Sequence, residues 1–172
     1  MSGVKASKLW AGASGYAFKE WKGSFYPEKI APEAMLAWYA ERLPTVEINN
    51  TFYQMPKVAV LEHWAQATPE AFRFAIKASR RITHDARLKA DAALCLSERE
   101  DTNAPPPLVE TAPWGYVRLR LEHYGEDDLA QWAQRLAATR WQETHVYFMH
   151  EPTAPGYAAA LLRLDAARAD SA

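Results

Sequence analysis

The chain has 172 residues and a mass of 19.4 kDa, which fits one domain, because two domains of ordinary size need roughly 200 residues or more. Hydrophobic residues make up 49% of the sequence and charged residues 24%, values that exclude wholesale disorder, a collagen-like repeat and a disulfide-built miniprotein. Lys and Arg total 20 and Asp and Glu total 21, so no overall charge points to a polyanionic partner.

Short β-type runs alternate with amphipathic helical runs along the chain. Six strands are predicted, at residues 9–15, 45–53, 72–78, 92–98, 115–121 and 144–150. Helices are predicted at residues 32–43, 57–67, 83–89, 127–139 and 155–168. In the second helix Val58, Leu61 and Trp64 recur at helical spacing, so we expect all three to face inward. Strands that alternate with helices indicate a parallel sheet covered by helices, an α/β fold.

The amino terminus and the single cysteine bear on compartment. Residues 1–5 lack the apolar core of a secretory signal, and no apolar stretch approaches the roughly 20 residues that span a bilayer. Cys95 excludes an intramolecular disulfide, and within the apolar run 92–96 we expect it to be a buried small hydrophobic residue. These features predict a cytoplasmic protein with no membrane partner.

Alternation along four strands separates an apolar face from a polar one. In an α/β barrel one strand face packs against helices and the other points into the barrel, so we expect the polar sets to face inward. The predicted inward residues are Glu47, Asn49, Thr51, Arg73, Ala75, Lys77, Tyr116, Arg118, Arg120, His145, Tyr147 and Met149. The polar groups among them run toward the carboxyl ends of the strands, where α/β folds build their sites.

The charges of this inward set are mostly cationic, with Lys77, Arg118 and Arg120 against Glu47. Burying unpaired charges is expensive, so these groups either pair with each other or hold an anionic ligand. A structural ion-pair network and a ligand site both fit the pattern. The sequence leaves the two interpretations open.

Several motifs carry a family resemblance. The longest are residues 12–16 (GASGY), 20–27 (EWKGSFYP), 45–53 (TVEINNTFY), 72–78 (FRFAIKA) and 114–120 (WGYVRLR). Together they resemble the YecE-like family, domain of unknown function 72. The resemblance implies a TIM-barrel-like fold with no established activity, and it implies no cofactor. By analogy, Glu47, Asn49, Lys77 and Arg118 stand where the family carries polar residues at its strand ends.

The middle of the family pattern has no counterpart in this sequence. One family strand ends in a Gln-Leu-Pro-Pro-like motif and another carries a Glu-Phe-Arg-His-like motif, but here residues 87–89 lead directly into what resembles the sixth family strand, 92–98. A complete barrel takes about 250 residues. We therefore expect one domain, residues 1–172, forming an incomplete or contracted barrel of about six strands. It lacks the equivalent of the fourth and fifth βα units after about residue 89, and it is prone to self-associate through the incomplete sheet.

Three functions fit these observations. The first is an enzyme-like site at the carboxyl ends of the strands that binds a small phosphorylated or carboxylated metabolite, with Glu47 as acid/base or orienting carboxylate. The residues predicted to bind the ligand are Asn49, Lys77, Tyr116, Arg118 and Arg120. The second is a non-catalytic binding module or a nucleic-acid-associated module that uses the basic segment 77–89, although a solvated helical face is the plainer interpretation of that segment. The third is a shortened homologue without activity.

Metal and cofactor motifs are absent from the sequence. Glu47, Glu98, His150 and Glu151 are candidate metal ligands by residue type only, because no paired Cys/His or HExxH spacing supports them. The run 12–15 (GASG) is neither a P-loop nor a dinucleotide-binding fingerprint. We therefore predict no metal and no cofactor.

Overall fold

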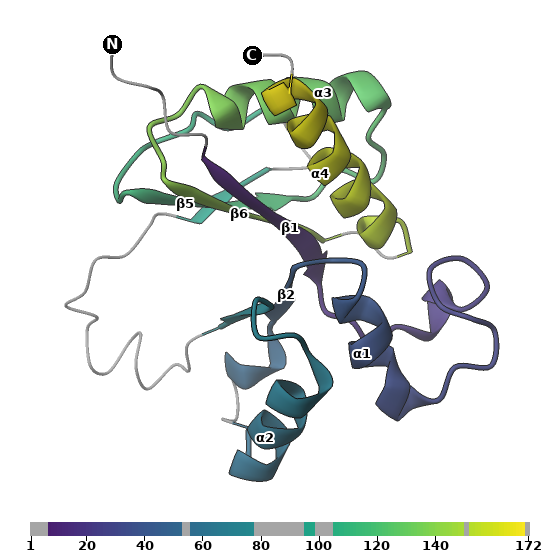
Figure 1. The fold of residues 1–172 in the computed structure, drawn as a ribbon. Helices are drawn as coiled ribbons and strands as arrows, with labels where there is room; N and C mark the ends of the chain where they lie inside the picture. Colours follow the sequence, from purple (N-terminus) through teal and green to yellow (C-terminus); the bar gives the residue numbers. More distant parts are fainter. Residues whose placement is uncertain (1–6, 53–55, 78–94, 99–104, 150–151, 171–172) are drawn as a thin grey trace.

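The computed structural model describes residues 7–52, 56–77, 95–98, 105–149 and 152–170. Its strands are β1 (Lys8–Ser14), β2 (Thr45–Ile48), β3 (Arg73–Ile76), β4 (Cys95–Ser97), β5 (Trp114–Leu119) and β6 (Glu143–Phe148). They form one sheet in the order β3-β2-β1-β6-β5-β4, and every neighbouring pair is parallel. The sheet curls into a half-barrel (Figure 1), so the predicted α/β, TIM-barrel-like fold with six strands is confirmed.

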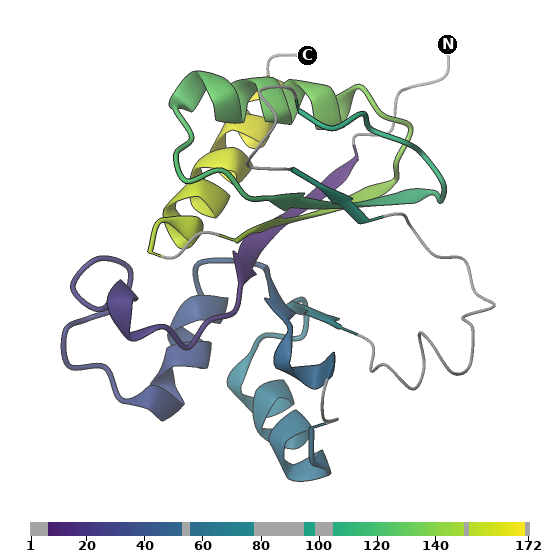
Figure 2. The same cartoon turned by 180° about the vertical axis from the view of Figure 1, so that it is seen from behind.

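Helices cover the convex face of the sheet. They are α1 (Met35–Ala40), α2 (Val58–Ala67), α3 (Glu126–Ala137) and α4 (Ala154–Asp170), with short 3-10 turns η1 (Lys19–Trp21), η2 (Pro32–Ala34) and η3 (Asn50–Phe52). In both views α3 and α4 lie together beside β1, β5 and β6, while α1 and α2 lie beside β2 and β3 (Figures 1 and 2). The predicted helix 83–89 lies outside the described residues. None of the described helices is long and apolar enough to cross a membrane.

The sequence of α3 shows why these helices form and how they pack. Its first turn holds Glu126, Asp127 and Asp128, whose charges favour the positive end of the helix dipole, and the Asp128 carboxylate accepts from the Gly125 backbone N at 2.8 Å. Its buried side chains are Leu129, Trp132, Ala133 and Leu136, as the helical spacing predicts. The opposite face of α3 is left to solvent.

The core lies between the helices and the convex face of the sheet. Alternate strand residues point into it and are buried, namely Ala11, Ala13, Val46, Ile48, Val117, Leu119, Val146 and Phe148. Because successive side chains of a strand point to opposite faces, the residues between them are turned toward the concave face. The predicted division of β2, β5 and β6 into a helix-facing side and an inner side is therefore confirmed.

A close approach between β1 and β2 sets the position of the site. A Cβ on Gly12 would lie 2.1 Å from the Thr45 carbonyl oxygen, so only glycine fits there. The buried Tyr39 hydroxyl bridges the same two strands, since it accepts from the Ala13 backbone N at 2.8 Å and donates to the Thr45 carbonyl at 2.9 Å. This bridge fixes the register that brings Ser14 opposite Glu47.

Two predictions of burial are wrong. Val58 and Leu61 of α2 are 70% and 37% exposed, and only Trp64 is buried, stacked on Phe74. The reason is the place of α2 beside β3, which ends the strand order, so the helix meets the sheet along one part of its surface only. Cys95 is also exposed rather than buried, because its position opposite Tyr116 turns it to the concave face.

Candidate functional site at the carboxyl ends of the strands

Four polar side chains from three strands meet on the concave face near the carboxyl ends of the strands. Ser14 ends β1, Glu47 lies in β2, Asn49 directly follows β2, and Arg118 lies in β5. The Ser14 hydroxyl donates to Glu47 Oε2 at 2.5 Å, and the Asn49 amide nitrogen donates to the same oxygen at 2.9 Å. The order β2-β1-β6-β5 together with the curl of the sheet brings these distant segments to one place.

An ion pair forms the centre of this cluster. Arg118 Nε and Nη2 donate to Glu47 Oε1 at 2.8 and 2.5 Å, and Nη2 also donates to Asn49 Oδ1 at 2.8 Å. The Tyr116 hydroxyl donates to the same Glu47 oxygen. The Glu47 side chain is 2% exposed and that of Arg118 is 20% exposed. A buried carboxylate is thus neutralised and fully hydrogen bonded, while the Arg118 side chain keeps part of its surface exposed.

The environment of Glu47 holds it in the charged form. Burial by itself raises the pKa of this carboxyl group, but hydrogen bonds from Ser14 and Tyr116, the charge of Arg118 and a hydrogen bond from Asn49 outweigh burial, and the net pKa lies below its ordinary value. A carboxylate with this many donors is a fixed negative charge near neutral pH. Its two oxygens are occupied by partners from within the protein.

The other predicted cations lie at the same end of the sheet. Lys77 is exposed immediately after β3, where its backbone N donates to the Ile48 carbonyl and its carbonyl accepts from the Thr51 hydroxyl. Arg120 is exposed immediately after β5. The structure therefore brings Glu47, Asn49, Tyr116 and Arg118 into one cluster and places Lys77 and Arg120 at the ends of neighbouring segments.

Cys95 belongs to this end of the concave face, although the sequence did not indicate it. The residue is exposed by its surface area, but its thiol is partly desolvated by its surroundings, which is the largest influence and raises its pKa; the charges of Arg118, Glu47 and Lys77 also act on it. The thiol therefore lies within electrostatic reach of the cluster. Its run, residues 92–96, is apolar throughout, so it lacks the polar alternation that marked the other inner faces.

Glu98 is a structural carboxylate in this arrangement. It is buried, and its Oε2 accepts from the Arg120 backbone N at 3.0 Å and from the Tyr124 hydroxyl. It therefore fixes the path of the chain as it leaves β5. Of the four metal-ligand candidates, His150 and Glu151 lie outside the described residues, and no group of three His, Cys, Asp or Glu within the described ranges could hold a metal ion.

Aromatic rings fill the opposite end of the concave face. Trp10 stacks on His145 with 6.3 Å between ring centroids, Trp114 meets His145 edge-on at 6.1 Å, and the Arg73 guanidinium lies 5.3 Å from the Trp10 centroid. Burial is the main cause that lowers the pKa of His145. This stack closes the amino end of the half-barrel, the end that barrels use for stability rather than chemistry.

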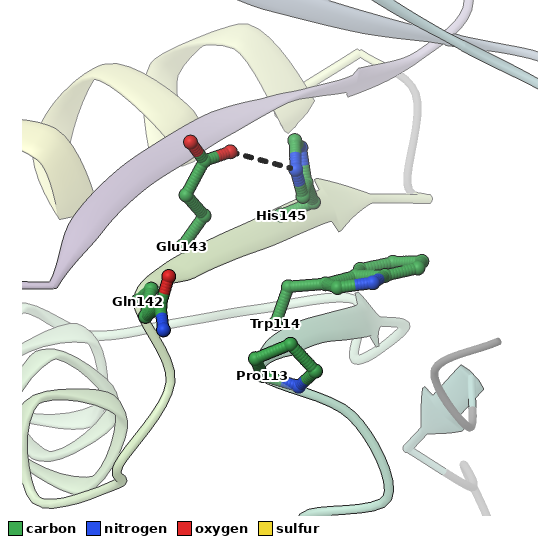
Figure 3. Close-up of a pocket in the computed structure, with 5 residues that line it drawn as sticks. All are labelled: Pro113, Trp114, Gln142, Glu143 and His145. Atoms are coloured by element: carbon green, nitrogen blue, oxygen red, sulfur yellow. Dashed lines mark ion pairs between the residues drawn. The ribbon is translucent and has the colours of Figure 1, made fainter. Parts of the chain in front are cut away.

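A pocket of about 350 Å³ lies beside the aromatic stack (Figure 3). Its lining residues are Pro113, Trp114, Gln142, Glu143 and His145. Figure 3 shows Glu143 and His145 projecting from one strand, with the carboxylate 3.8 Å from the imidazole, and Trp114 projecting from the neighbouring strand. The polar groups that converge on a buried charge lie at the carboxyl end, so that end is the stronger candidate site.

The basic segment considered for nucleic acid is described only at its first residue. Lys77 is exposed, whereas Arg80, Arg81, Arg87 and Lys89 lie outside the described residues. Nucleic-acid binding through this segment therefore stays a prediction from the sequence.

Solved structures with the same fold come from two bacteria. A DUF72 family protein of Thermotoga maritima MSB8, TM1631, aligns with a TM-score of 0.64 and 16% identity, covering 94% of this chain and 99% of that chain. A DUF72 family protein of Enterococcus faecalis V583, EF0366, aligns with a TM-score of 0.69 and 12% identity, covering 92% of this chain and 95% of that chain. At these identities the likeness shows the fold.

Sequence comparison identifies the family. The UPF0759 protein YunF of Bacillus subtilis (strain 168) is 37% identical over 60 residues, a stretch that covers 35% of this chain and 21% of YunF. The family described as "Protein of unknown function DUF72" matches residues 10–101 and again residues 89–171. The two matches together span residues 10–171 and overlap at residues 89–101, a stretch that includes β4. The chain therefore belongs to the DUF72 family.

Proposed function

We propose that the protein binds a small anionic ligand, a phosphorylated or carboxylated metabolite, at the carboxyl end of its concave face. The observation that carries this proposal is that the Arg118 guanidinium is held in place on one side only. Its Nε and Nη2 are held by Glu47 and Asn49, whereas Nη1 donates none of these bonds and the side chain is 20% exposed. A guanidinium fixed in this way loses little further freedom when it binds an anion.

The surrounding charges support an anion over a cation. Among the described residues at this end, Lys77, Arg118 and Arg120 are cationic, and Glu47 and Glu98 are anionic. Because Glu47 neutralises Arg118, long-range attraction would come from the two exposed cations. Arg118 would then supply the short-range contact, since guanidinium groups match the planar geometry of carboxylate and phosphate.

Glu47 fits the role of an orienting carboxylate better than that of an acid/base. Its Oε1 accepts from Arg118 and Tyr116, and its Oε2 accepts from Ser14 and Asn49. A general base needs an oxygen within reach of the proton that it removes. We therefore propose that Glu47, Tyr116 and Asn49 hold Arg118 in place, and the proposal extends to binding rather than to a named reaction.

A ligand screen tests the proposal. Thermal unfolding of the purified protein at low ionic strength would be followed with a panel of sugar phosphates and small carboxylates, and positives would be titrated by calorimetry. We expect at least one compound to raise Tm, and Arg118→Lys, which keeps the charge but loses the planar fork, to weaken its binding at least tenfold. Arg140→Lys is the matched control, because Arg140 is exposed and pairs with Glu110 far from the site.

Each other outcome has a defined meaning. If no compound raises Tm, the anion-binding proposal is wrong and the interpretation as a shortened homologue without activity gains support. If a compound binds equally well to the Arg118→Lys and Arg140→Lys variants, the ligand binds elsewhere. Oligonucleotide binding that weakens steeply with salt and is insensitive to Arg118 would favour the basic segment instead.

A further inference from the structure

One side of the molecule exposes large apolar side chains. Val58, Val60 and Leu61 of α2 are 70%, 39% and 37% exposed, and Ile76 of β3 is 42% exposed. Val58 and Leu61 are three residues apart and share one side of α2, whereas Val60 points away from Val58; we call Val58, Leu61 and Ile76 the α2–β3 face. In both views α2 lies at one extremity of the molecule (Figures 1 and 2). Large apolar side chains exposed at one end of a molecule are typical of a surface that contacts a partner.

The strand order identifies what is missing beside this face. β3 and β4 are the two ends of the order β3-β2-β1-β6-β5-β4, while β1 and β6 pair as the first and last strands of a closed barrel would. An eight-stranded barrel would place two more βα units between β3 and β4. In the described part of the chain, β3 with the α2–β3 face and β4 with Cys95 are therefore the two strands that flank these positions.

The chain itself is too short to fill these positions. β3 ends at Ile76 and β4 begins at Cys95, so 18 residues join them. Two βα units of a barrel take roughly 60 residues. The family also matches this chain in two stretches, 10–101 and 89–171, rather than in one. Eighteen residues are therefore too few to supply two complete βα units between β3 and β4.

We propose that a second copy of this chain covers the α2–β3 face, with β3 of one copy beside β4 of the other. All six strands of the sheet are parallel, so a two-fold axis along the strand direction keeps strands of both copies parallel. Under this symmetry β3 of each copy lies beside β4 of the other. The two contacts are identical, and together they pair both β3 edges and both β4 edges of the dimer. An unrelated protein would have to present two matching edges at the same spacing.

Oligomeric state is the first test. Light scattering coupled to size-exclusion chromatography should give about twice the 19.4 kDa monomer mass at micromolar concentration. The double substitution Val58→Asp and Leu61→Asp should reduce this mass by about half while leaving the circular dichroism spectrum unchanged, because both side chains are exposed in the single chain. Val109→Asp is the control at another exposed apolar residue, which lies between β4 and β5 and is 45% exposed, and it should leave the dimer intact. A wild-type protein that is monomeric at all concentrations would overturn the proposal.

The native cysteine provides a test of which edges meet. Ala75 of β3 lies opposite Glu47 and Cys95 of β4 lies opposite Tyr116, so both side chains face the concave side at their edges. In the Ala75→Cys variant, mild oxidation should give a disulfide-linked dimer on a non-reducing gel, and adding Cys95→Ser should abolish it. An equally strong disulfide-linked dimer of the wild type would mean that β4 meets β4, which contradicts the proposed pairing.

Discussion

Glu47 Oε1 and Arg118 Nη2 lie 2.5 Å apart on the concave face, although the two residues are 71 positions apart in the sequence. The carboxylate is almost completely shielded from water, and four polar neighbours converge on it, one from β1, two from β5 and one that directly follows β2. For such a pair, removing one partner lowers the free energy of unfolding mainly because the other charge is left buried alone. The attraction between the two charges contributes less. Single and double substitutions of the pair should therefore change stability by different amounts.

Removing Arg118 alone should therefore destabilise the protein more than removing the whole pair. Arg118→Met leaves the Glu47 charge buried without its partner, and we expect the free energy of unfolding to fall by about 3–5 kcal/mol. The double variant Glu47→Gln and Arg118→Met should recover most of this loss. Urea unfolding followed by tryptophan fluorescence measures both values. Similar destabilisation of Arg118→Met and Arg140→Met would contradict the prediction, because Arg140 pairs with Glu110 at the surface.

The same pair predicts how stability changes in acid. The pKa of Glu47 is lower in the folded protein than its ordinary value of 4.5, so the unfolded chain binds the proton more tightly. The stabilising contribution is fully present above pH 4.5 and is lost as the pH falls through the lower pKa of the folded state. The free energy of unfolding of the wild type should fall more steeply below this pH than that of the double variant. If the free energy of unfolding falls equally steeply with decreasing pH in the two proteins, another group is responsible for the loss of stability in acid.

Two glycines should respond in opposite directions to the same substitution. Gly12→Ala forces a methyl group to 2.1 Å from the Thr45 carbonyl oxygen, and we expect a loss of about 3 kcal/mol of stability. Gly156→Ala in α4 meets nothing within 4 Å and should stabilise the protein by about 0.5 kcal/mol through improved helix propensity. Thermal and urea unfolding compare the two variants directly. Equal effects would mean that the close approach of β1 and β2 is absent.

Tyr39→Phe should weaken the connection between β1 and β2. The substitution removes the hydroxyl that serves the Ala13 backbone N and the Thr45 carbonyl, and both groups are then buried without this partner. We expect a loss of about 1–3 kcal/mol. Tyr157→Phe is the matched control, because the Tyr157 ring packs edge-on against Tyr124 and should retain that contact without its hydroxyl. Amide hydrogen exchange at Ala13 should accelerate in the Tyr39 variant and stay slow in the control.

The inward positions of the cluster follow from the sequence, whereas the contacts between them do not. Period-two alternation places Glu47, Tyr116 and Arg118 on the polar side of their strands, because the other side must be apolar to meet helices. The sequence left open whether these charges pair or await a ligand. The answer depends on the curl of the sheet and on the register of β1 with β2, which alternation within one strand cannot determine.

The errors have a common physical origin. Helical spacing shows that Val58 and Leu61 share a face, but it does not show whether a neighbour covers that face, and here the helix lies beside the last strand of the order. Likewise, an apolar run around Cys95 indicates a strand without indicating which of its residues points inward. In both cases the pattern describes the segment, while burial depends on what packs against it.

The pairing of β1 with β6 has a consequence for how the protein is made. Leu9 lies beside Thr144, so the central strand pair joins the first and last strands of the sheet. On the ribosome, β1, β2 and β3 emerge first. The edge of β1 that pairs with β6 stays unpaired until β6 has been synthesised, near the end of the chain. Contacts between such distant segments slow folding, and unpaired strand edges invite aggregation in the interval. The nascent chain should therefore be most dependent on chaperones between the synthesis of β3 and the release of β6.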